Sequence, residues 1–60
     1  MHVYNVTEFG YVEIHGPADL AKIGPGEKIA VIGEYAPEDI ARWAAEIGKA
    51  VMRGVEVERL

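Results

Sequence analysis

Apolar and polar residues alternate in part over the first fifteen positions, on either side of a glycine, which predicts a β-hairpin over residues 2–15. A three-residue loop at 8–10, with its glycine at positive φ, would place Tyr4 opposite Ile14. A two-residue loop would instead pair Tyr4 with Glu13 and mix the two faces of the hairpin. We therefore expect the three-residue loop, because it collects the apolar side chains on one face: Tyr4, Val6, Val12 and Ile14.

A glycine and a proline interrupt this pattern at 16–17, and residues 17–23 predict a short helix. The turn sequence Gly-Pro-Gly at 24–26 precedes a strand over residues 28–33. That strand carries four consecutive apolar residues without alternation. Such a run is typical of a central strand that is buried on both of its faces.

Pro37 is expected to begin the longest helix, because proline suits the first helical position and two acidic residues follow it. Two glycines fit the end of this helix. Either Gly48 ends it and a strand begins at residue 50, or the helix continues to residue 53 and Gly54 ends it. Four apolar residues at helical spacing predict the buried stripe: Ile40, Trp43, Ala44 and Ile47.

These elements predict one small α+β domain over residues 1–60. Its fold class is a two-layer sandwich, in which an N-terminal β-hairpin and a βαβ unit form a four-stranded mixed sheet with one long helix. One long helix covers only one face of a sheet. The apolar strand at 28–33 therefore predicts that the short helix at 17–23 or a second subunit covers the other face, and we expect a homodimer.

The composition excludes several kinds of chemistry. The chain has no serine, cysteine or glutamine, which removes the nucleophiles of serine and cysteine enzymes, thiolate metal sites and disulfides. We assign no catalytic residue, no cofactor and no metal. A net charge of −4 with scattered cations opposes nucleic-acid binding. No apolar run suits a membrane span, so we expect a cytoplasmic protein, and the abundance of charged over neutral polar residues favours a thermophilic origin.

Three residues are candidates for a partner or ligand surface: Glu13, His15 and Tyr35. Glu13 and His15 lie two residues apart on one strand face, where a metal would need a third ligand. His2 falls on the opposite face in the predicted register, so the pair is interpreted as a solvated surface. Tyr35 follows the strand at 28–33, at the edge where open α/β sheets bind ligands.

Three segments within residues 24–51 carry a resemblance to a known family: GEKIAVI at 26–32, PEDIARWA at 37–44 and IGKAV at 47–51. They resemble the second half of the TusA-like sulfur-carrier family, which implies a two-layer α/β fold with this segment as strand, helix and strand. The family works through a cysteine in a Cys-Pro motif. The corresponding stretch at 15–18 reads His-Gly-Pro-Ala, so the resemblance implies the fold without the persulfide chemistry.

The sequence thus predicts a small non-catalytic interaction or structural module that associates with itself or with another protein. The alternative is a small-ligand-binding protein, or an enzyme that uses carboxylates and His15, with its site at a subunit interface.

Overall fold

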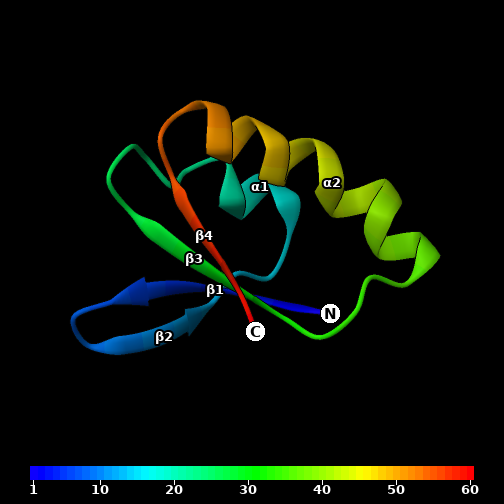
Figure 1. Ribbon diagram of the computed structural model, residues 1–60, viewed down its shortest axis with the longest axis horizontal. Coiled ribbons are helices and arrows are strands. Elements are labelled where there is room, and N and C mark those ends of the chain that lie inside the picture. The colour runs from blue at the N-terminus through cyan, green and yellow to red at the C-terminus, as the bar shows by residue number, and fades with distance from the viewer.

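The computed structural model describes all 60 residues and contains every element that the sequence predicts. The short helix is shorter than expected and the third strand ends one residue earlier. The elements are, in chain order, β1 (His2–Thr7), β2 (Gly10–Glu13), α1 (Pro17–Leu20), β3 (Lys28–Ile32), α2 (Pro37–Met52) and β4 (Glu56–Arg59) (Figure 1).

The four strands form one mixed sheet in the order β2-β1-β3-β4. Strand β1 is antiparallel to β2 and β3, whereas β3 and β4 are parallel and are joined through α2. Both helices lie over the same face of the sheet (Figure 1). The predicted fold class is therefore confirmed. The short helix does not cover the second face, which is left without a helix and is called the open face below.

The register of the hairpin differs from the prediction. Residues Thr7 and Gly10 pair directly, so the loop has two residues, and Tyr4 faces Glu13. The hydroxyl of Thr7 accepts a hydrogen bond from the Phe9 amide at 3.1 Å and donates one to the Gly10 carbonyl at 2.9 Å, which fixes the short turn. Gly10 has the expected positive φ, at +114°.

The physical reason for this register lies outside the hairpin. Strand β1 is also paired with β3, and Val3 lies beside Val31 in the buried layer. Ile14, which follows β2, lies opposite Val3. The Ile14 amide donates a hydrogen bond of 2.8 Å to the Val3 carbonyl. The face of β1 that carries Val3 is therefore the buried one. Tyr4, on the alternate face, lies on the open side of the sheet.

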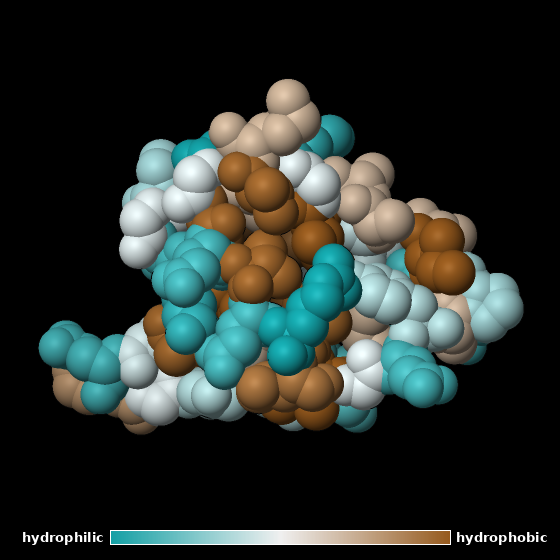
Figure 2. Space-filling view, viewed as in Figure 1, coloured by the Kyte–Doolittle hydropathy of each residue, from teal (hydrophilic) through white to brown (hydrophobic).

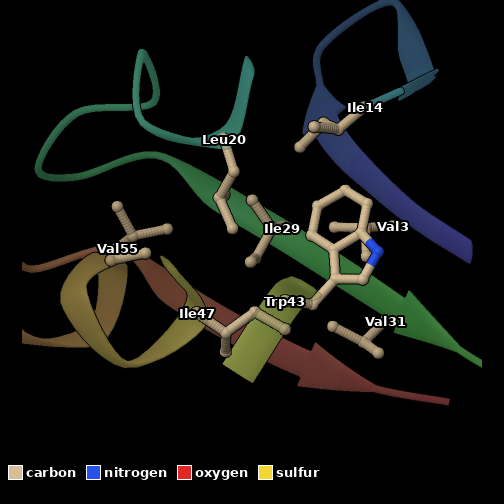
Figure 3. Packing of buried hydrophobic residues seen from close by; sticks show 9 residues of the cluster. Val3, Ile14, Leu20, Ile29, Val31, Trp43, Ile47 and Val55 are labelled. Atoms are coloured by element: carbon tan, nitrogen blue, oxygen red, sulfur yellow. The ribbon is translucent and has the colours of Figure 1, made fainter. Parts of the chain in front are cut away.

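The core lies between the sheet and the two helices (Figure 3). In β3, three consecutive residues have almost no exposed surface, which confirms the prediction of a strand that is buried on both faces. The side chain of Leu20, from α1, is fully buried beside that of Ile29. Nine residues form this core: Val3, Ile14, Leu20, Ile29, Val31, Trp43, Ile47, Ala50 and Val55.

The buried stripe of α2 is rotated from the predicted one. Trp43, Ile47 and Ala50 face the sheet, as the residues of a helix do at spacings of three and four. Ile40 and Ala44 were expected in this stripe, but both are exposed. They lie on the neighbouring strip of the helix surface.

The long helix ends at the second of the two predicted positions. It continues through Gly48 to Met52, and Gly54 follows with φ +93°. The Val55 amide donates to the Ala50 carbonyl at 2.9 Å, and the Gly54 amide donates to the Val51 carbonyl at 3.1 Å. These two bonds form a Schellman motif, which requires a residue with positive φ and is completed by apolar contact on its inner side.

The two glycines of this region should respond oppositely to the same substitution. Gly54→Ala should destabilise the protein by about 1–2 kcal/mol, because a Cβ is penalised at positive φ. Gly48→Ala should stabilise it by up to about 1 kcal/mol, because alanine is the better helix former and, apart from the backbone of α2 itself, no atom lies within 4 Å of the added Cβ. Urea denaturation measures both values. Equal effects of the two substitutions would contradict this helix end.

Candidate functional site

An apolar groove of about 480 Å³ lies between α2 and the sheet edge formed by β4. In Figure 2, hydrophobic residues gather at the centre of this side of the molecule, between the helical layer and the sheet, with hydrophilic residues around them. The residues that line the groove come mostly from one strip of α2: Tyr35, Ile40, Ala44, Ile47, Gly48, Val51 and Arg59.

The groove lies where a second apolar strip of α2, beside the buried stripe, borders the end of β4. The buried stripe covers β3 and the inner side of β4. The next strip of the helix, which carries Ile40, Ala44 and Val51, lines the groove together with Arg59 of β4, the last strand of the sheet. Ile40 and Val51 are each 55% exposed as a result. This strip is apolar surface that the chain itself does not cover.

A tyrosine and an arginine form the polar part of the lining. Arg59 donates a hydrogen bond from Nη1 to the Tyr35 hydroxyl at 2.7 Å. Its guanidinium carbon also lies 5.4 Å from the centre of the Tyr35 ring, within the range of a cation–π interaction. Tyr35 follows β3 and Arg59 ends β4, so both lie at the carboxyl end of the parallel pair. This is the position that open α/β sheets use for ligands.

Asp39 fixes the loop that carries Tyr35. Its Oδ2 accepts a hydrogen bond from the Ala36 amide at 3.2 Å and contacts the Met1 amino group at 3.4 Å. The Ala36 bond, followed by the Met1 contact, lowers the pKa of the Asp39 carboxyl below its usual value. The carboxylate thereby satisfies a free amide at the first turn of α2 and holds the loop against the helix.

Of the three residues that the sequence singled out, only Tyr35 lines the groove. Glu13 lies on the open face in β2, at the opposite edge of the sheet. Its carboxylate is 4.0 Å from Nδ1 of His15 and 3.3 Å from Nδ1 of His2. The placement of His2 on the opposite face was wrong, because the two-residue loop changes the register. No group of three or more histidine or acidic side chains is arranged to hold a metal ion.

The open face carries charged and aromatic side chains in place of a helix. The rings of Tyr4 and Tyr11 lie 6.0 Å apart across β1 and β2. Lys28 forms an ion pair of 3.0 Å with Glu58, which joins β3 to β4. The hydrogen bond and the charge of Glu58 raise the pKa of Lys28. This face is therefore mixed in character, whereas the groove is mainly aliphatic.

Sequence reasoning missed the other residues of the groove, although two signals were present. Six apolar positions on α2 span a wider arc than the edge of a four-stranded sheet can bury: Ile40, Trp43, Ala44, Ile47, Ala50 and Val51. In β4, alternation places Arg59 on the same side as Val57, the side that faces the helix. A charge at an inward position indicates a partner such as Tyr35.

Comparison with known protein families, with characterised proteins and with solved structures finds no match to this chain. The resemblance of residues 24–51 to the TusA-like sulfur carriers therefore stays a prediction. Neither helix has the length and apolar character that crossing a membrane requires.

The ionisation of Asp39 should contribute to stability. Because its pKa is lowered on folding, this contribution is complete above the ordinary pKa of an aspartate, about 3.9, and is lost as the pH falls through the lowered value. Asp39→Asn should therefore lose less stability than the parent protein between pH 5 and pH 2 (about the range over which a salt-bridged aspartate titrates). Thermal unfolding across this range measures the difference. Parallel curves for the two proteins would contradict the assignment.

Proposed function

We propose that this protein is a small non-catalytic interaction module that binds a partner through the groove between α2 and β4. The observation that carries the proposal is the uncovered apolar strip of Ile40, Ala44 and Val51 beside the ordered pair of Tyr35 and Arg59. Exposed apolar surface of this kind, bordered by polar residues, is characteristic of sites that bind other proteins or ligands.

The chemistry of the lining supports binding over catalysis. Five of its seven residues are hydrophobic, and its one charged group, Arg59, is engaged by Tyr35. The enzyme alternative would use Glu13 and His15 together with Tyr35. Within one chain these residues lie at opposite edges of the sheet, so that alternative depends on a second subunit that brings them together.

Site-specific photo-crosslinking tests the proposal. A photoreactive benzophenone side chain at position 40 should form a covalent adduct with a protein in extracts of the source cells, because this position lies inside the groove. The matched control is the same side chain at position 42, which is exposed on the solvent side of α2. Adducts at both positions in equal yield, or none at position 40, would overturn the groove as a binding surface.

Self-association through the open face is a second candidate, and a separate observation favours it. The open face has no helix, and its aromatic pair of Tyr4 and Tyr11 lies beside Val6 and Ile32, which are only half-buried. A second copy that packed there about a two-fold axis would cover this surface on both protomers. Such burial would add to the small core of a 60-residue chain.

Light scattering after size exclusion measures this association. The protein should have the mass of a dimer that dissociates on dilution, and Tyr11→Asp should be monomeric because it places a charge within the interface. Phe9→Asp is the matched control, since Phe9 lies at the tip of the hairpin and is 91% exposed. A monomer at every concentration from millimolar to low micromolar (about the range in which a weak dimer forms) would exclude the dimer.

A further inference from the structure

We propose that β4 accepts an extended segment of a partner protein as a fifth strand, whose apolar side chains enter the groove and whose basic side chains face Glu56 and Glu58. This inference rests on the proposed function and names the kind of partner that the groove binds. Addition of a strand to a free sheet edge is a known mode of peptide recognition, in which the backbone supplies affinity and alternate side chains supply specificity.

The backbone of β4 is free on its outer side. On the inner side, the Glu56 amide donates a hydrogen bond to the Glu27 carbonyl, just before β3, and the Leu60 amide donates one to the Val31 carbonyl in β3. Both are 2.9 Å long. Because successive residues of a strand direct their backbone groups to opposite sides, those of Val57 and Arg59 point away from β3. No strand follows β4 in the sheet. A partner strand would find donors and acceptors at these two residues.

The two faces of the added strand would meet different surroundings. On the helix side, its side chains would lie beside the groove that Ile40, Ala44 and Val51 line together with Arg59 of β4. On the open side, they would lie beside Glu56 and Glu58. Glu56 is exposed and forms no ion pair, while Glu58 is already paired with Lys28. Alternating apolar and basic side chains match this arrangement, because opposite charges on neighbouring strands attract each other.

The same charges oppose a second copy of this chain at the edge. If two β4 strands paired about a two-fold axis with their helices on one side, opposite residues would share a face. Two registers pair most of this four-residue strand. A register centred on Val57 places Glu56 of one copy opposite Glu58 of the other, and one centred on Glu58 places the two copies of Glu58 opposite each other. Strand β2 of a second copy would bring Glu13 to the same face. Like charges in these positions repel, so the partner is a different chain.

Synthetic peptides test the inference directly. The probe is a fluorescently labelled octapeptide of alternating lysine and valine, measured by anisotropy. It should bind at least tenfold more tightly than alternating glutamate and valine, and than four lysines followed by four valines. On binding, the amides of Val57 and Arg59 should become protected from hydrogen exchange, as measured by nuclear magnetic resonance.

A pair of charge reversals provides the control. Glu56→Lys should weaken binding of the lysine–valine probe at least tenfold, because it reverses the unpaired charge beside the added strand. Glu8→Lys makes the same change in the exposed hairpin loop and should leave binding unaltered.

The outcomes separate this inference from the proposed function. Equal binding of the alternating peptide and of the peptide with four lysines followed by four valines would overturn strand addition. Binding that leaves the amides of Val57 and Arg59 unprotected would do the same. Both results would leave the groove as a binding surface. Failure of the peptides together with position-specific adducts at residue 40 would also overturn strand addition alone. Absence of both would overturn the inference and the proposed function.

Discussion

Burial of strand β3 under a single helical layer is the contact on which the rest of this small domain depends. Ile29 and Val31 pack against Leu20, Trp43 and Ile47, so both helices must lie on one side of the sheet. Neither helix of these 60 residues lies on the other side of the sheet (Figure 1). The core therefore forms a single layer between the sheet and the two helices, and the open face lies outside it.

That single layer also determines where the groove lies. Helix α2 has to return the chain from the end of β3 to the start of β4, and its sixteen residues lie along this parallel pair. Strand β4 is the last in the sheet, so any apolar surface of α2 beyond it has nothing underneath. Here the sheet ends at β4, a strand of four residues whose outer edge is unpaired.

The helices and strands, and their order along the chain, could be predicted from the sequence, because local residue patterns specify each of them. Pro37 and the acidic residues after it begin the long helix, and the uninterrupted apolar run identifies β3. The hairpin register was not predictable from the hairpin alone. Alternation within residues 2–15 favours placing Tyr4 beside Ile14, but pairing of β1 with β3 commits Val3 to the core.

The groove was missed for a related reason. Helical spacing identifies a set of apolar residues, but which of them are buried depends on how far the sheet extends below the helix. Ile40 and Ala44 have the spacing of core residues, but both are exposed and line the groove beside Arg59 of β4. Tyr35 could be predicted as a site residue, because it directly follows β3 in the chain and the sequence shows this order. Its contact with Arg59 is between residues far apart in the chain.

Hydrogen bonds hold both ends of α2 in place, and this makes its exposed apolar strip a suitable surface for binding. At its start, Asp39 holds the Ala36 amide, and at its end the bonds around Gly54 return the chain to the sheet. Arg53 adds two hydrogen bonds from its guanidinium to carbonyls near α1, each of 3.0 Å, which tie the two helices together. A partner would therefore meet a helix whose position is already set. Little conformational entropy remains to be lost on the protein side, and such preorganisation increases affinity for a given buried area.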